Sequence, residues 1–408
     1  MVLTIKKLNY KSYFVFCWAL IAFFTIDPYI TWNTYKFHTL FSLVYDIFRI
    51  IMLLLICFYF ISKQNKHIMQ KQIIAVILFM ISYIYRMVDT ADGSISISAG
   101  VISTAIFCTT FMLLDDDYKA DAFNFFLTVF AITLIPGILV CICSLVHISL
   151  PYEIIQSTEA IKVASNLHYK KYFLSVILEN PWWPAGYRKL CGMYDEAGRV
   201  GTIAGMLLPV LPMKSKSKKD RVVIIIIIIA GLMTCSLTFY VFLGLFVLLK
   251  LVEEKKITIK KMVTICAGTI ILLYLATTNE YFQTQVIRRF NLEAIVINNN
   301  RISDAFEYIY NEFIVSKNFW FGMGSGNAVI GTVDAAGYQI IIYCFGIIGF
   351  LLVVAWLLYT GIAFCERKKK AIYLFVFFIL SFYQRGWIFP FYHILILYGG
   401  IAFSKRDE

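Results

Sequence analysis

The sequence predicts an all-α membrane protein, a polytopic bundle of about twelve transmembrane helices with two large extracytoplasmic loops. Two observations predict this fold. Hydrophobic residues make up 60% of the 408-residue chain and charged residues only 15%, whereas a soluble domain carries about 25% charged residues. Apolar runs of roughly 20 residues, the length that crosses a bilayer, also recur from end to end. We therefore expect a single membrane domain over residues 1–408.

The predicted spans follow one another along the chain with short polar connections. The stretch 222–252 fits either one tilted span or two short spans with a turn at Thr234–Ser236. Two spans place the basic clusters between the runs on one side, as the positive-inside rule requires, with both termini cytoplasmic. The twelve predicted spans are 12–30, 39–62, 72–88, 95–114, 122–150, 198–213, 222–236, 237–252, 262–278, 337–364, 371–386 and 387–403.

The N-terminus and the polar residues exclude several classes of protein. The basic lead Met1–Lys11 precedes an apolar run without a small-residue cleavage site, which predicts an uncleaved first span. The net charge of +12 comes from short Lys and Arg clusters between spans, so we expect no nucleic-acid partner. The ten cysteines show no metal-binding spacing and no disulfide framework. The five histidines show no ligand spacing, and one of them, His168, falls in a large outer loop; the others are His38, His67, His147 and His393. We expect no metal and no cofactor.

The first large loop, 151–197, carries candidate chemistry close to a membrane surface. Apolar residues at helical spacing over Glu153–Ser165 and Tyr169–Leu178 predict two helices that lie along the interface. Arg188 opens a charged segment that runs directly into the next span. A solvated loop with salt bridges is one interpretation. The other is a site where cations hold a phosphate and a carboxylate takes a proton, with residues Arg188, Tyr194, Asp195, Glu196 and Arg199.

The second large loop, 279–337, also carries arginines. Arg288, Arg289 and Arg301 precede a stretch over Ser303–Val315 whose apolar residues recur at helical spacing. The glycine string that follows, 322–326, predicts a tight turn where a ligand or another helix comes close.

Three further features have two interpretations each. Asp46 and Arg49 lie within one predicted span and form either a functional site or a mutually neutralising pair. Arg385, at an outer helix boundary, either contacts a lipid diphosphate or extends to the headgroups. Asp115–Asp117 is similar to the metal-binding aspartates of nucleotide-sugar transferases, but it falls in a short cytoplasmic turn with no room for a nucleotide domain.

The two loops together resemble the bacterial O-antigen polymerase family, which is related to the O-antigen ligases. The resemblance rests on Arg188 followed by Gly192-Met-Tyr-Asp-Glu-Ala-Gly198, and on Arg301 before an aromatic helix. It rests also on Asn318-Phe-Trp-Phe-Gly-Met-Gly-Ser-Gly-Asn327 and on the aromatic run into Phe345–Gly349. Ala197 stands where the family often has proline. The histidine that ligases carry before the next span is absent, which favours a polymerase.

The resemblance implies a glycosyltransferase in the bacterial inner membrane that joins glycans carried on undecaprenyl diphosphate. It implies a metal-independent, inverting reaction at the periplasmic face. Arg188, Arg199 and Arg301 would hold the diphosphate, with Arg288 and Arg289 in reserve, and Glu196 or Asp195 would be the base. The implied partners are lipid-linked glycans, membrane lipids, a chain-length regulator and a flippase. A flippase of lipid-linked units and an O-antigen ligase are the alternative functions.

Overall fold

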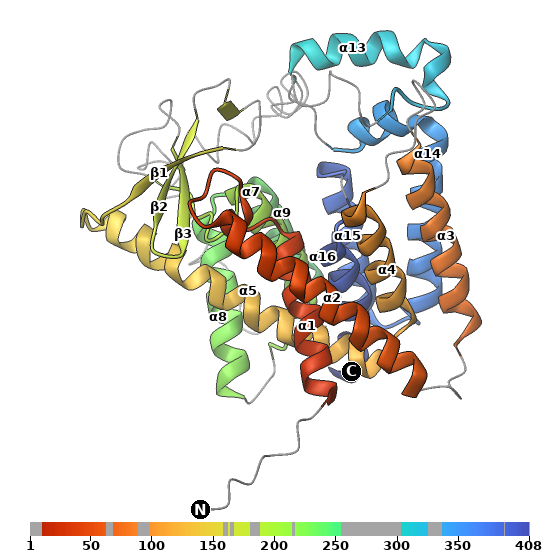
Figure 1. The fold of residues 1–408 in the computed structure, drawn as a ribbon, viewed down its shortest axis with the longest axis horizontal. Coiled ribbons are helices and arrows are strands. Elements are labelled where there is room, and N and C mark those ends of the chain that lie inside the picture. The colour runs from red at the N-terminus through yellow and green to blue at the C-terminus, as the bar shows by residue number, and fades with distance from the viewer. Residues whose placement is uncertain are drawn as a thin grey trace, which may run out of the picture. The chain divides into compact units, whose positions relative to one another are not determined.

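Apolar runs separated by short polar connections give a chain that is mostly helix, with a minor sheet (Figure 1). Within the described residues, three helices are long and apolar enough to cross a membrane: α2 (His38–Ser62), α5 (Asp116–Leu145) and α14 (Tyr338–Phe364). The computed structural model describes residues 10–62, 68–88, 98–157, 162–163, 167–179, 188–213, 217–253, 303–324, 337–386 and 388–407.

The chain divides into two compact units. The first contains Met1–Ile132, Tyr310–Ile330 and Gly337–Glu408, and the second contains Thr133–Ile309 and Gly331–Ala336. Helix α5 passes from the first unit into the second.

Aromatic side chains fill the core of the first unit. Trp18 is fully buried, with its ring centroid 5.3 Å from that of Phe111 and 5.1 Å from that of Phe391. Trp356 donates its indole N–H to the Tyr398 hydroxyl at 3.2 Å. The other elements of this unit are α1 (Tyr10–Thr25), η1 (Tyr29–Thr31), α3 (Gln70–Met87), α4 (Ala99–Leu113), η4 (Lys317–Phe319), α15 (Lys369–Gln384), α16 (Phe391–Ile394), η5 (Leu395–Gly399) and α17 (Gly400–Asp407).

Helix α14 breaks at Gly346, whose φ of 66° is not helical. Residues 322–324 of the glycine string pack into this break: Met323 N–H donates to the Tyr343 carbonyl at 2.8 Å, and Gly324 N–H donates to the Cys344 carbonyl at 3.0 Å. A Cβ at Gly322 would overlap the Cys344 carbonyl. The sequence predicted that a ligand or another helix comes close to this turn, and in the structure helix α14 does so.

The first loop is a correction to the all-α prediction. Instead of interfacial helices over Glu153–Ser165 and Tyr169–Leu178, the second unit contains a three-stranded antiparallel sheet in the order β1-β2-β3. The side chains of Ile155, Tyr169 and Tyr172 are buried, and β-branched and aromatic residues favour a pleated surface. The helix predicted over Tyr169–Leu178 is wrong, and the one predicted over Glu153–Ser165 is wrong at Glu153–Gln156, which form a strand, whereas residues 162–163 are helical. The strands are β1 (Glu153–Gln156), β2 (His168–Tyr172) and β3 (Ser175–Glu179).

The stretch 222–252 forms two helices, as the charge pattern predicts. Helices α8 (Lys218–Met233) and α9 (Leu237–Glu253) meet at Cys235, which has a φ of +48°. Both pack on α7 (Ala197–Leu207), which η2 (Leu208–Val210) extends. With 11 residues, α7 is roughly 17 Å long, shorter than the ~30 Å hydrocarbon core. Protein surrounds it, since most of its side chains are buried.

Each of the other predicted spans contains a described helix, except 262–278, which lies outside the described residues. The helix predicted at Ser303–Val315 is α13 (Asp304–Ile314), and the Ser303 hydroxyl accepts the Phe306 N–H at 3.2 Å at its start. The full number of membrane crossings and the cytoplasmic placement of the termini remain predictions.

Candidate functional site

The segment that begins at Arg188 is held in place by its backbone. Val176 N–H in β3 donates to the Gly192 carbonyl at 2.7 Å, and Leu190 N–H donates to the Met233 carbonyl at the end of α8 at 3.1 Å. Gly192 has a φ of +63°, and a Cβ on Gly137 would lie 3.0 Å from its Cα. Glycine at both positions lets the segment lie against α5. The sheet, α5 and α8 therefore fix the chain on either side of the candidate residues.

Tyr194 anchors this segment from inside the protein. Its side chain is 0% exposed, and its hydroxyl shares a hydrogen bond of 2.8 Å with the Thr133 hydroxyl. Burial raises the pKa of Tyr194, so the phenol stays neutral. We predicted Tyr194 as a substrate-binding residue. The structure places it in the interior, where it positions the neighbouring residues.

Asp195 is buried in ion pairs. One carboxylate oxygen lies 3.2 Å from Arg199 Nη2 and 3.7 Å from Lys162 Nζ, and the Asp195 side chain is only 6% exposed. The Tyr169 hydroxyl donates to the Asp195 backbone carbonyl at 2.6 Å. Burial restricts the access of an acceptor hydroxyl to Asp195, and its carboxylate already serves to orient Arg199.

Glu196 is the more accessible carboxylate of the pair. It is half-buried, at the N-cap of α7, where its backbone carbonyl accepts the Arg199 N–H at 3.1 Å. The helix dipole favours a negative charge at this position. Arg199 is half-buried as well, so a carboxylate and a guanidinium are both partly accessible within one helical turn.

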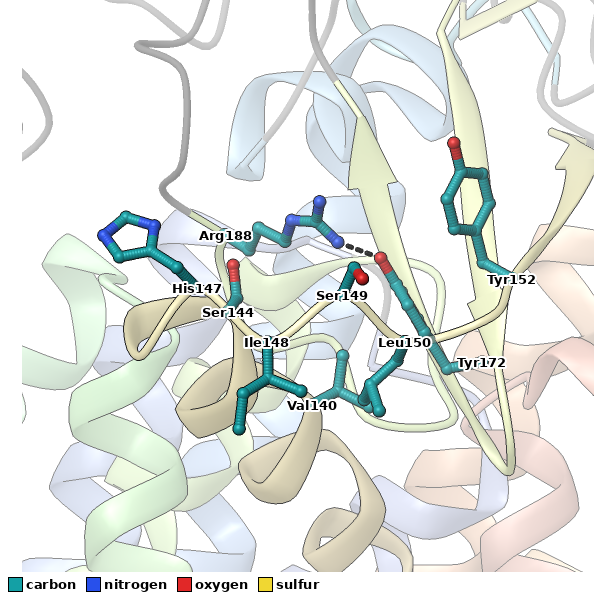
Figure 2. A pocket seen from close by; sticks show the side chains of 9 residues that line it. All are labelled: Val140, Ser144, His147, Ile148, Ser149, Leu150, Tyr152, Tyr172 and Arg188. Atoms are coloured by element: carbon teal, nitrogen blue, oxygen red, sulfur yellow. Dashed lines mark hydrogen bonds between the residues drawn. The ribbon is translucent and has the colours of Figure 1, made fainter.

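Arg188 lines a pocket of about 220 Å³ (Figure 2). Its Nη1 donates to the Tyr172 hydroxyl, and its guanidinium carbon lies 5.7 Å from the centre of the Tyr172 ring. Among the residues that the structure describes, no carboxylate pairs with Arg188. A half-buried arginine whose side-chain partner is a neutral phenol has donors to offer an external anion.

The pocket has a polar part and an apolar part. In the view of Figure 2, Arg188 and the hydroxyls of Ser144 and Tyr172 lie above the apolar side chains of Val140 and Ile148. This combination suits the junction between a phosphate headgroup and a hydrocarbon chain. Pockets for drug-sized ligands span about 300–1,000 Å³, so this smaller one fits a single headgroup. The remaining lining residues are His147, Ser149, Leu150 and Tyr152.

Sequence reasoning missed most of this pocket. It selected Arg188, but not Tyr172, which comes 16 residues earlier, because it expected a helix there instead of strand β2. It set His147 aside because no ligand spacing surrounds it, and it placed His147 within a predicted span. In the structure α5 ends at Leu145 and His147 lies in an exposed turn, although the apolar run had predicted a span through residue 150.

The other predicted residues are placed separately or not at all. Arg385 belongs to the first unit, where it is half-buried at the C-cap of α15 and its backbone N–H donates to the Ser381 carbonyl at 2.7 Å. Arg301, Arg288 and Arg289 lie outside the described residues. The proposed diphosphate-binding set is therefore described only in part.

The aspartate cluster Asp115–Asp117 is engaged with protein partners. Asp115 accepts the Tyr59 hydroxyl at 2.9 Å, Asp116 lies 3.4 Å from Lys119 Nζ, and Asp117 lies 2.7 Å from Arg406 Nη2. Within the described part of the chain, no group of three His, Cys, Asp or Glu residues has the geometry to hold a metal ion. These contacts give the cluster a structural role.

The charged pair Asp46 and Arg49 in α2 is also engaged. Arg49 Nη1 lies 2.9 Å from Asp46 Oδ1, and Nη2 donates to the Ala99 carbonyl at 2.8 Å and to the Ser103 hydroxyl. These contacts join α2 to α4 and favour the interpretation of a neutralising pair.

No known protein family and no curated protein matches this sequence.

Proposed function

We propose that this protein is a lipid-linked oligosaccharide polymerase that transfers a glycan from undecaprenyl diphosphate to the end of another lipid-linked unit. One observation carries the proposal: Arg188, with no carboxylate partner among the described residues, lines a pocket that begins at the end of the membrane-length helix α5. A lipid diphosphate presents the matching chemistry, because its charged headgroup lies at the end of a hydrocarbon chain. The proposed location is the periplasmic face of a bacterial inner membrane.

The reaction needs two kinds of help, and the segment Arg188–Arg199 offers both. The acceptor hydroxyl oxygen attacks the anomeric carbon of the donor glycan, and the bond from that carbon to the diphosphate oxygen breaks. The lipid diphosphate leaves with the electron pair, and Arg188 and Arg199 stabilise its charge. The acceptor proton passes to Glu196, the accessible carboxylate. Attack opposite the leaving group inverts the anomeric centre.

Asp195 and Tyr194 support these residues indirectly in this mechanism. Asp195 pairs with Arg199 at 3.2 Å, which fixes the guanidinium near the start of α7. The buried hydrogen bond between Tyr194 and Thr133 holds the backbone on which Glu196 lies. Arg301, Arg288, Arg289 and Arg385 remain predicted contacts to the diphosphate lipids.

Deletion of the gene tests the function against its two alternatives. A strain without a polymerase still exports and attaches one unit, so its surface glycolipid should run on a gel as core plus a single repeat. A strain without a flippase or a ligase attaches no repeat at all, and either result in place of the single repeat would refute the proposal. Restoration of long chains by a plasmid copy is the control.

A further inference from the structure

Helix α5 ends in a motif that normally requires glycine. Ile148 N–H donates to the Cys143 carbonyl at 2.8 Å, and His147 N–H donates to the Ser144 carbonyl at 3.2 Å. These two bonds define a Schellman motif, in which the residue at the His147 position adopts the left-handed conformation. The φ of His147 is +59°. Glycine adopts this conformation without strain, and histidine does so only at a cost.

His147 is one of the residues that line the same pocket as Arg188, and in the view of Figure 2 its imidazole lies at the opposite end of the Arg188 side chain from the guanidinium. His147 is exposed, and among the described residues it makes no side-chain hydrogen bond or ion pair. The last carbonyls of α5 carry a partial negative charge that would repel an anion in the pocket. An imidazole N–H at this helix end offers a donor where the backbone offers acceptors.

We propose that His147 is a second phosphate-binding residue of this pocket. One ring N–H donates a hydrogen bond to a phosphate oxygen of the headgroup that Arg188 holds. Ser144 and Tyr172, which also line the pocket, supply hydroxyls to the same headgroup. The identity of the headgroup as a lipid-linked diphosphate rests on the proposed function, whereas the binding role requires only an isoprenoid diphosphate.

The positive φ at His147 makes a clean variant available. His147→Gly removes the imidazole and places the residue that the left-handed conformation prefers, so the fold should be at least as stable. His147→Asn also tolerates this conformation and keeps an N–H donor. The purified full-length protein in detergent would be titrated with farnesyl diphosphate and, as a neutral probe, with farnesol.

We expect His147→Gly to weaken farnesyl diphosphate binding by about tenfold or more, which is the effect of one hydrogen bond to a charged group. The affinity of His147→Asn for farnesyl diphosphate should lie between that of His147→Gly and that of the wild type. Farnesol binding should not change, and the melting temperature should be equal or higher. Equal affinity of the glycine variant and the wild type for farnesyl diphosphate, or no binding by the wild type, would overturn the proposal.

A second variant separates this inference from the proposed function. If Arg188→Ala loses farnesyl diphosphate binding while His147→Gly keeps it, the pocket binds the anion and the role of His147 is wrong. If His147→Gly weakens binding as expected but gene deletion leaves no repeat on the surface glycolipid, the binding role stands and the polymerase function falls.

Discussion

Two groups of charged residues in this protein differ in whether their basic side chains have acidic partners. In the first unit, three acidic residues near the start of α5 have basic partners: Asp121 lies 2.6 Å from Lys11, Asp117 lies 2.7 Å from Arg406, and Glu366 lies 3.1 Å from Lys405. In the second unit, after the end of α5, the Arg188 guanidinium donates to a tyrosine hydroxyl and has no acidic partner among the described residues.

The difference separates cohesion from binding. The paired group links the C-terminal helix α17 to α5 and connects Glu366 to both Lys71 and Lys405. Such a network satisfies its own charges and leaves little for a ligand. The Arg188 guanidinium is half-buried and has no carboxylate partner among the described residues. An external anion would offset the cost of this desolvation. The comparison therefore assigns stability to the first group and substrate binding to the second, and each prediction below tests one side of it.

The largest expected effect is on Glu196, the proposed base. Glu196→Gln keeps the shape of the side chain and removes its ability to take a proton, so chain elongation should slow by about 10²–10⁴-fold. The measurement is the ladder of glycolipid lengths when the variant gene complements a deletion strain, normalised to protein amount by immunoblot. Glu179→Gln is the matched control. Glu179 on β3 pairs with Lys170 on β2 at 2.5 Å, so this substitution should leave elongation unchanged. A normal ladder from Glu196→Gln would remove Glu196 from the mechanism.

The next effect is on Arg188. Arg188→Ala should slow elongation by about 10²–10³-fold, the usual result of removing one preorganised donor from a developing charge. Arg188→Lys should recover only part of the rate, because lysine supplies a point charge without the planar fork of donors. Lys171→Ala is the control, since Lys171 pairs with Glu153 at 2.8 Å. Normal elongation by Arg188→Ala would show that Arg188 does not bind the diphosphate, and that the lack of an acidic partner does not identify the substrate site.

The three described helices that are long and apolar enough to cross a bilayer were predictable because a bilayer sets the length of an apolar run. A run such as that of α14 has to be apolar over about 20 residues, and no partner elsewhere in the chain is needed to recognise it. The break at Gly346 was not predictable in the same way. It depends on a backbone approach by the segment at Gly322, which follows α13.

The sheet was missed because its strands are short. In five residues such as β2 or β3, apolar positions match a helical period and a strand period about equally well. The pairing of Tyr169 with Leu178 becomes visible only after the chain folds. The candidate site followed the same rule. Arg188 and Glu196 stand out by charge in the sequence, but Tyr172 and His147 join the pocket through the sheet and the end of α5.

The smallest effect is expected in the paired group. The Glu366 side chain is 45% exposed and hydrogen-bonded by Lys71 and Lys405, so Glu366→Gln should lower stability by no more than about 1 kcal/mol, as for other exposed ion pairs. The hydrogen bond from Lys71 lowers the pKa of the Glu366 carboxyl, and Lys405 lowers it further against the opposing effect of burial. A lowered folded-state pKa adds stability that is present above the unfolded value of about 4.3 and is lost as the pH falls through the folded value.

The melting temperatures of wild type and Glu366→Gln in detergent should therefore differ slightly at pH 7 and converge as the pH falls below the lowered pKa of the folded Glu366 carboxyl, where the wild-type carboxyl is also protonated. The glycolipid ladder should be normal for Glu366→Gln, because the described residues that line the proposed headgroup pocket include no member of this group. A shortened ladder from Glu366→Gln, with the protein folded and abundant, would contradict the assignment of the paired group to stability. The paired group near the start of α5 would then have a role beyond stability.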